Sequence, residues 1–157
     1  MMSVVFLSLF VAAADQLFKM LIRSFPVGTV VLRLHPVAEI THCVNRGAAF
    51  SMFSDHPVLL AVCSFLLICL MLYIAFCLMS LTKAGRLSIA VLLGGGVGNL
   101  IDRLAFGGVT DYIRVLFVRF PVFNLADIAI TLSVAALILL LLTGKLENTG
   151  EKYGSDD

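Results

Sequence analysis

Four long runs of apolar residues divide this chain, and polar residues gather where those runs begin and end. The pattern predicts helices over about 2–22, 58–81, 83–101 and 124–143, followed by a polar tail over 145–157. About 20 apolar residues in a helix are enough to cross roughly 30 Å of hydrocarbon. We therefore expect an all-α membrane protein, a single integral membrane domain over 1–157 with four transmembrane helices.

The first run has a second interpretation as a cleaved signal peptide, because the three alanines at 12–14 resemble a cleavage site of small residues. The start MMSVV carries no Lys or Arg, however, and apolar character resumes after Asp15 as far as Phe25. We expect this helix to be retained.

Two connections are too long to be simple turns, and with four crossings both fall on the same side of the membrane. In the first, β-branched stretches over 27–34 and 37–44 predict a small sheet or hairpin, and GAAFSMF (47–53) predicts a short interfacial helix. The second long connection covers 102–122. Aromatic residues of the kind that favours the headgroup zone lie in it and directly after it: Tyr112, Phe117, Phe120 and Phe123. The tail from Lys145 onward is expected to be disordered and dispensable.

Composition agrees with a membrane protein: 61% of residues are hydrophobic and 13% charged, against about 45–50% and about 25% in soluble domains. The net charge is +1 and no basic stripe alternates with aromatics, so no nucleic-acid partner is expected. The count of Lys and Arg leaves the orientation undecided. No metal-ligand spacing is found, and we interpret the cysteines as small core residues: Cys43, Cys63, Cys69 and Cys77.

Polar residues inside or beside the apolar runs share helix faces, all near one membrane surface. Their spacing of three or four positions puts them together in small groups: Asp15 with Lys19, Asn99 with Asp102 and Arg103, and Asn124 with Asp127. Asn45 joins them from the first long connection. Ion pairing and helix capping account for the Asp15–Lys19 and Asp102–Arg103 pairs.

Asp111 and Asp127 differ from these pairs because neither has a cation at helical spacing. The alternation in VTDYIRVLFV indicates an extended segment, which puts Arg114 on the face opposite Asp111. A carboxylate near a helix centre in a membrane costs roughly 2.5–3.5 kcal/mol by insertion scales, and less near the interface. Two carboxylates close together share a proton, which suits one to activate water and the other to polarise an amide carbonyl.

Other classes of protein remain open at this point. A proton- or ion-coupled carrier also places acids in the membrane, but near the midplane and on both sides of it. A non-catalytic membrane subunit would pack through the glycines of GGGVG (94–98) and tolerate Asn in place of both aspartates. The same glycines lack the Lys-Ser/Thr sequel of a phosphate-binding loop.

Five segments, in this order, resemble those of the lipoprotein signal peptidases (signal peptidase II), a family of bacterial membrane aspartic endopeptidases. They are DQLFK (15–19), NRGAAF (45–50), GGGVGNLIDR (94–103), GGVTDY (107–112) and FNLAD (123–127). The resemblance covers essentially the whole chain except the tail. The stretch 113–120 is more basic and aromatic than the family leads us to expect.

The resemblance implies an enzyme that removes the signal peptide of diacylglyceryl-modified prolipoproteins by cleaving just before the lipidated cysteine. It implies a monomer without cofactor or metal, in contact with membrane lipids, with both termini cytoplasmic and the site on the periplasmic side of the inner membrane. It places catalysis on Asp111 and Asp127. The residues that it assigns to supporting or substrate-binding roles are Asn45, Gly47, Asn99, Asp102, Arg103, Asn124, Asp15 and Lys19.

Overall fold

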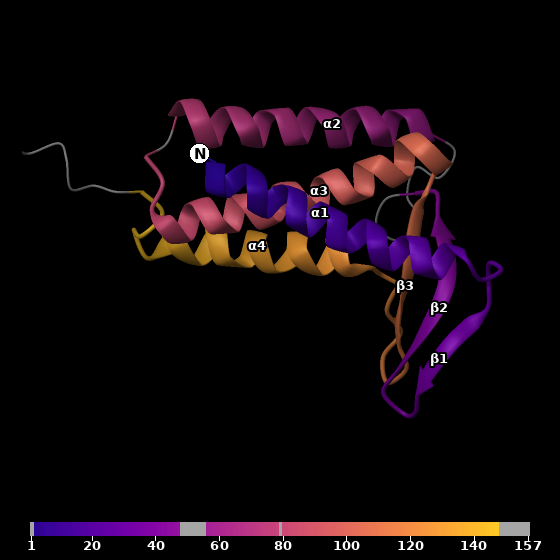
Figure 1. The fold of residues 1–157 in the computed structure, drawn as a ribbon. Helices are drawn as coiled ribbons and strands as arrows, with labels where there is room; N and C mark the ends of the chain where they lie inside the picture. Colours follow the sequence, from indigo (N-terminus) through magenta and orange to yellow (C-terminus); the bar gives the residue numbers. More distant parts are fainter. Residues whose placement is uncertain (1, 48–55, 79, 148–157) are drawn as a thin grey trace, which may run out of the picture.

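The computed structural model describes residues 2–47, 56–78 and 80–147, with four long helices side by side and a small sheet at one end (Figure 1). All four helices are long and apolar enough to cross a membrane. The expected fold class, four transmembrane helices with a small β-rich segment, is confirmed. The interfacial helix expected over 47–53 lies, apart from its first residue, outside the described residues.

The helices are α1 (Met2–Arg23), α2 (Pro57–Tyr73), α3 (Lys83–Phe106) and α4 (Leu125–Leu142), and α2 continues as a π-helix, η2 (Ile74–Leu78). α3 lies at the centre of the bundle and packs against the other three helices. It runs past the expected end at residue 101 to Phe106, where Gly107 adopts the left-handed conformation (φ 68°) and ends the helix. Asp102 and Arg103 therefore lie within α3 rather than beyond it.

Glycines of the GGGVG segment allow the neighbouring helices to approach α3 closely, as the sequence predicts. A Cβ added to Gly94 would lie 2.6 Å from the backbone oxygen of Ser8 in α1. One added to Gly95 would lie 2.7 Å from the backbone oxygen of Ala126 in α4. Neither space admits a methyl group, so these positions serve helix packing.

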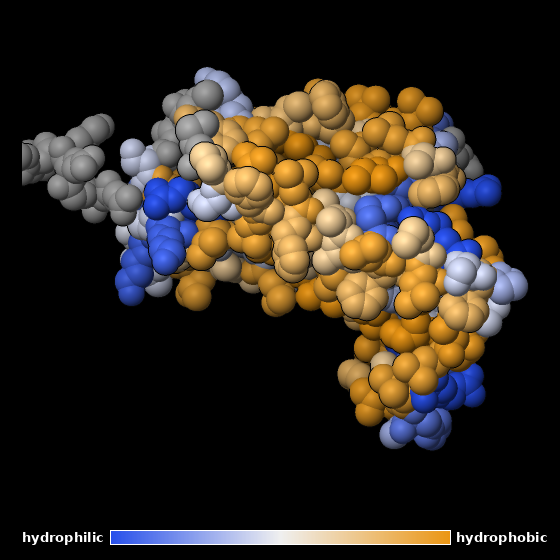
Figure 2. Space-filling view, in the orientation of Figure 1, coloured by the Kyte–Doolittle hydropathy of each residue, from blue (hydrophilic) through white to orange (hydrophobic). Residues whose placement is uncertain are grey.

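Apolar side chains cover the outer surface of the bundle, as expected where lipid is the solvent (Figure 2). Among the residues of α2, Ala61 alone is buried. Cys63 and Cys69 are exposed on this helix and Cys43 is half-buried in the sheet, so the interpretation of these cysteines as core residues is wrong. A thiol is a small apolar group that lipid solvates as well as a protein core does. The side chain of Cys77 lies outside the described part.

β1 (Val30–Leu34), β2 (Ala38–Asn45) and β3 (Val109–Val115) form an antiparallel sheet in that order. The predicted hairpin supplies β1 and β2, and β3 joins them from the other long connection. Cys43 of β2 pairs with Asp111 of β3. The sheet lies at the end of the bundle where α1 and α3 end and α4 begins (Figure 1), so it meets the polar ends of three helices.

The opposite end of the bundle is closed by the turn before α3 and by the chain after α4. Thr82 caps α3: its Oγ1 accepts from the backbone N–H of Gly85 at 3.2 Å and donates to the backbone oxygen of Lys145 at 2.9 Å. Its backbone N–H donates to the oxygen of Leu146 at 3.0 Å. The expectation of disorder is therefore wrong for residues 145–147, because their carbonyls accept hydrogen bonds from the start of a helix.

Candidate active site

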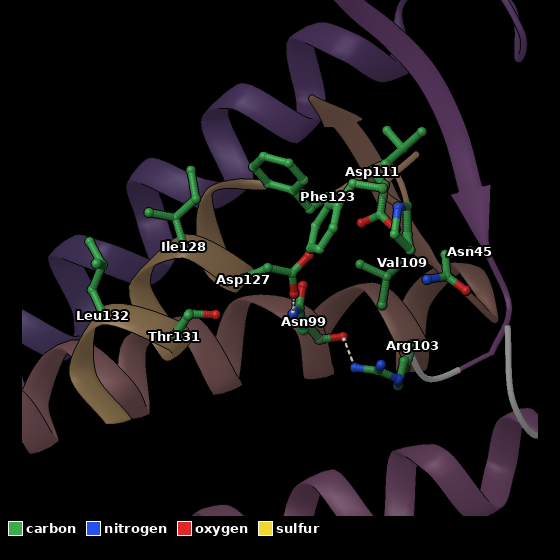
Figure 3. Close-up of a pocket in the computed structure, with 13 residues that line it drawn as sticks. Asn45, Asn99, Arg103, Val109, Asp111, Phe123, Asp127, Ile128, Thr131 and Leu132 are labelled. Carbon is green, nitrogen blue, oxygen red and sulfur yellow. Dashed lines mark hydrogen bonds between the residues drawn. The ribbon is translucent and has the colours of Figure 1, made fainter. Parts of the chain in front are cut away.

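Asp111 and Asp127 line one cavity but come from different elements, Asp111 from β3 and Asp127 from the first turn of α4 (Figure 3). The cavity has a volume of about 450 Å³, and Asn45, Asn99 and Arg103 contribute its other polar walls. Among the described residues, no Lys or Arg forms an ion pair with either aspartate. The structure thus places in one cavity two acids whose proximity the sequence alone could not establish.

Asn124 joins the two aspartates. Its Nδ2 donates to Oδ1 of Asp111 at 2.7 Å, and its Oδ1 accepts from the backbone N–H of Asp127 at 2.9 Å. Its own backbone N–H donates to Oδ2 of Asp127 at 3.2 Å, which completes a capping box at the start of α4. One side chain therefore fixes the helix terminus and both carboxyl groups.

Asp127 accepts hydrogen bonds on both carboxyl oxygens. Oδ2 accepts from the backbone of Asn124, and Oδ1 accepts from Nδ2 of Asn99 at 2.8 Å. The N-terminus of α4 directs its positive dipole end at the same group. Amide donors and a helix N-terminus are a suitable environment for a carboxylate.

Asp111 lies in a different environment, since its residue is only 3% exposed. Burial raises the pKa of Asp111 to about 7, and the negative charge of Asp127 contributes to the rise. Hydrogen bonds from Asn45 and Asn124 and the charge of Lys19 act in the opposite direction. At neutral pH, Asp111 is therefore divided between its protonated and ionised forms.

Asp15, Lys19 and Asp102 form a fully buried ion cluster next to the two acids. Nζ of Lys19 lies 2.7 Å from Oδ2 of Asp15 and 3.7 Å from Oδ2 of Asp102. Both carboxylates of the cluster also accept hydrogen bonds from backbone N–H groups. Oδ1 of Asp15 accepts from the N–H of Ala126 at 3.0 Å, and Oδ2 of Asp102 accepts from the N–H of Thr110 at 2.8 Å. Each of these N–H groups lies one residue before one of the two site aspartates, so the cluster positions both segments.

Of the remaining predicted residues, Asn45 and Arg103 line the cavity, and Gly47 is hydrogen-bonded to Asn45. Oδ1 of Asn45 accepts from the backbone N–H of Gly47 at 3.0 Å, and its side chain bonds to Asp111. Nη1 of Arg103 makes a long hydrogen bond of 3.4 Å to the backbone oxygen of Asn99 (Figure 3). A guanidinium has five N–H donors, so Arg103 retains donors for a bound molecule.

Three further contributors were missed by sequence reasoning. Gln16 Nε2 and Arg23 Nη1 both donate to Oδ1 of Asp102, at 2.8 and 3.0 Å. Gln16 and Arg23 are seven positions apart and so lie on one face of α1. This spacing could have indicated a shared partner, but polar residues are common at a helix end, so the signal is weak. Tyr112, expected in the headgroup zone, is buried instead, and its hydroxyl oxygen accepts from the backbone N–H of Leu125 at 3.2 Å. Burial raises the pKa of Tyr112 to about 12, so the phenol keeps its proton.

A second cavity of about 450 Å³ lies between α2, α3 and α4. It shares Asn99, Arg103 and Asp127 with the first cavity, and most of its other walls are aliphatic. The polar end of α3 and the first turn of α4 therefore face two spaces, one beneath the sheet and one between the helices.

A family model described as signal peptidase (SPase) II matches residues 7–143 of the chain. A lipoprotein signal peptidase of Dehalococcoides mccartyi is 39% identical over 134 residues, which are 83% of this chain and 82% of the relative. One of Lactobacillus johnsonii is 33% identical over 136 residues, 86% of this chain and 88% of the relative.

Two solved structures share the fold of this chain. A bacterial membrane enzyme determined by the in meso method at 2.3 Å resolution superposes with a TM-score of 0.86 at 26% identity, covering 99% of this chain and 96% of that one. A second, at 1.9 Å resolution, superposes with a TM-score of 0.82, also at 26% identity, covering 90% of this chain and 94% of that one.

Proposed function

The chain belongs to the signal peptidase (SPase) II family, and from that premise we propose that it is an aspartic endopeptidase with Asp111 and Asp127 as its catalytic pair. Its relatives are lipoprotein signal peptidases, so the chain is a membrane protease that processes prolipoproteins. We propose cleavage just before the diacylglyceryl-modified cysteine. The observation that carries the proposal is the placement around one cavity of two acids that are joined by Asn124 and form no ion pair with Lys or Arg in the described part of the chain.

In the free enzyme Asp111 holds the shared proton and Asp127 is the base. Asp127 takes a proton from water as the water oxygen attacks the scissile carbonyl carbon. Protonated Asp111 donates a hydrogen bond to the carbonyl oxygen, which gains negative charge. As the carbon–nitrogen bond breaks, the proton taken from water passes to the leaving amine. The raised pKa of Asp111 supports this division of roles.

The supporting residues keep these groups aligned. Asn99 donates to Asp127 and Asn124 donates to Asp111, and Nδ2 of Asn124 also donates to Oδ1 of Asn99 at 3.2 Å. Arg103 and Asn45 line the cavity with donors available to a peptide backbone. A substrate peptide that enters the cavity exchanges water for protein around its C=O groups, and such donors stabilise it there by pairing with these oxygens.

The depth of the pair suits a bond at the membrane surface. Asp127 lies in the first turn of α4, at the rim of a transmembrane helix. The second cavity runs from this rim between α2 and α4, and its aliphatic walls suit an acyl chain or an apolar signal helix. A substrate therefore reaches the acids without drawing its lipid into water.

We propose that both termini are cytoplasmic and that the site faces the periplasm across the inner membrane. The start of α1 and the end of α4 lie at the bundle end opposite the sheet (Figure 1), where Lys83, Arg86 and Lys145 also lie. Three arginines at the end of the bundle that carries the sheet form ion pairs: Arg23 with Asp102, and both Arg33 and Arg114 with Glu39. Because these arginines are paired with acids of the protein, we give them less weight when the Lys and Arg residues on the two sides of the membrane are compared to predict the orientation.

Cleavage of a diacylglyceryl-modified prolipoprotein tests the proposal. Asp111→Asn and Asp127→Asn should each lower the rate by about 10²–10⁴-fold, the usual contribution of an acid or base. Glu147→Gln is the matched control, because it makes the same change at the far end of the bundle and should leave the rate unchanged. Full activity of either aspartate variant would reject the catalytic pair and favour a non-catalytic subunit.

A further inference from the structure

The outer half of the sheet has one charged face and one apolar face. Arg33, Glu39 and Arg114 are cross-strand partners, and Glu39 binds both arginines, at 3.2 and 2.9 Å. The rows on either side of this charged row are apolar: Leu32, Ile40 and Ile113, and then Leu34, Ala38 and Val115. Successive residues of a strand point to opposite faces, so both apolar rows share the face opposite the charges.

The described part of the chain leaves this apolar face uncovered at its far end, where Leu32 and Leu34 are 52% and 54% exposed. The segment after β3 extends the apolar surface, with Phe117 at 74% and Val118 at 52%. A hydrogen bond of 2.9 Å from the N–H of Leu116 to the oxygen of Val37 holds this segment against the hairpin. We call Leu32, Leu34, Val37 and residues 116–120 the sheet tip. Exposed apolar groups gathered in this way usually mark a surface that binds something.

The position of the sheet tip indicates what covers it. The strands run crosswise to the helices and away from the bundle, so the tip overhangs the space beside the bundle (Figure 1). Hydrophobic side chains continue from the helices onto the side of the sheet nearer to them, and hydrophilic ones lie at its outer edge (Figure 2). Since lipid covers the helices, lipid is also the molecule that meets the tip.

We propose that the sheet tip is an interfacial membrane anchor, inserted at the boundary between headgroups and acyl chains beside α4. Arg119 lies within the tip and is exposed, and a guanidinium on a short apolar segment pairs with lipid phosphate while its neighbours insert. Asp111 lies near the start of β3 and the tip follows its end. The anchor therefore fixes the height of Asp111 relative to the membrane surface.

The chain contains no tryptophan, so one introduced tryptophan reports its own surroundings. Phe117→Trp places the reporter in the tip at a residue that does not line either cavity. Val27→Trp is the control, because Val27 is also exposed (65%) but belongs to the turn between α1 and β1, outside the sheet tip. Leu34→Trp is a second tip reporter if Phe117→Trp does not fold.

Both variants are reconstituted in phosphatidylcholine vesicles without substrate. Tryptophan at 117 should emit at shorter wavelength than tryptophan at 27, be quenched by brominated acyl chains and be protected from iodide. The proposal is overturned if iodide quenches both equally and brominated lipid quenches neither. It is also overturned if the protection disappears on dilution to one protein per vesicle, since a second copy of the chain would then be the partner.

Discussion

Nζ of Lys19 donates to Oδ1 of Asn99 at 2.8 Å, and Nδ2 of the same amide donates to Asp127 at 2.8 Å. An ammonium group only donates hydrogen bonds, and Nδ2 of Asn124 donates to the same Asn99 oxygen at 3.2 Å, so Lys19 and Asn124 together determine which end of the Asn99 amide faces the aspartate. The buried ion cluster of α1 is thereby connected to the proposed catalytic pair through one side chain.

Lys19→Met should lower the cleavage rate at least about tenfold, equivalent to about 1.4 kcal/mol of transition-state stabilisation. The amide of Asn99 loses the shorter of the two hydrogen bonds that orient it, and its hydrogen bond to Asp127 weakens. The same change leaves Asp15 without its buried partner, which should destabilise the protein by roughly 3–5 kcal/mol. Steady-state kinetics and thermal unfolding in detergent measure the two effects.

The double variant Asp15→Asn with Lys19→Met separates these effects. It removes both charges and keeps an oxygen for the N–H of Ala126, so thermal stability should largely return. Activity should stay low because Asn99 still lacks the hydrogen bond from Lys19. If activity returned together with stability, Lys19 would have a structural role only.

The cleavage rate should fall as the pH rises through about 7. The pKa of Asp111 is raised to about 7 by burial and by the charge of Asp127, and ionisation above this pH removes the proton that polarises the substrate carbonyl. The measurement is kcat/KM as a function of pH with a substrate that does not itself titrate in this range. A rate that continued to rise well above neutral pH would contradict the assignment of the proton to Asp111.

The stability of the wild type relative to Asp111→Asn should decrease between about pH 4 and pH 7. The folded protein has a pKa for Asp111 above the ordinary value of 3.8, so it binds the proton more tightly than the unfolded chain does. The resulting stabilisation is complete below the ordinary pKa and is lost as the pH rises through about 7. Asparagine does not titrate, so thermal unfolding of both proteins across this range isolates the contribution of Asp111.

Gly95→Ala should destabilise the bundle by about 1–3 kcal/mol, the usual cost of overpacking. The added methyl group would lie 2.7 Å from the backbone oxygen of Ala126, and backbone cannot move aside without shifting the turn that carries Asp127. Gly96→Ala is the matched control, because its nearest neighbour is a side-chain carbon of Ile68 at 3.4 Å. Thermal unfolding should show a loss for the first variant alone, and equal effects would contradict the packing assigned to Gly95.

Truncation after Thr143 should lower the unfolding temperature, whereas truncation after Glu147 should not. The shorter protein lacks the carbonyls of Lys145 and Leu146, so the hydroxyl and N–H of Thr82 lose their acceptors. Two such hydrogen bonds contribute about 1–3 kcal/mol. Comparable unfolding temperatures for the two truncated proteins would show that the residues after α4 do not stabilise the bundle.

The local pattern of the sequence was sufficient to predict the helices and strands and the contacts between residues of the same element. Apolar runs of membrane length predict helices because the bilayer leaves no other partner for the backbone. The pairing of Asn124 with Asp127 follows from a spacing of three at a helix start, where unpaired N–H groups need acceptors. The end of α3 was misplaced because polar residues that normally mark a water boundary are buried here among the residues of α1.

Only the tertiary structure decided which elements meet. Lys19 and Asn99 are 80 positions apart, and nothing within a short window of sequence relates them. Their contact depends on α1 approaching α3 at glycines that admit no side chain, and on the sheet lying against the helix ends. The sequence by itself determined four membrane helices, an extended segment with one acid and a helix start with another. Packing between distant segments determined that these acids share one cavity and that Tyr112 is buried, because burial depends on neighbours that local periodicity does not specify.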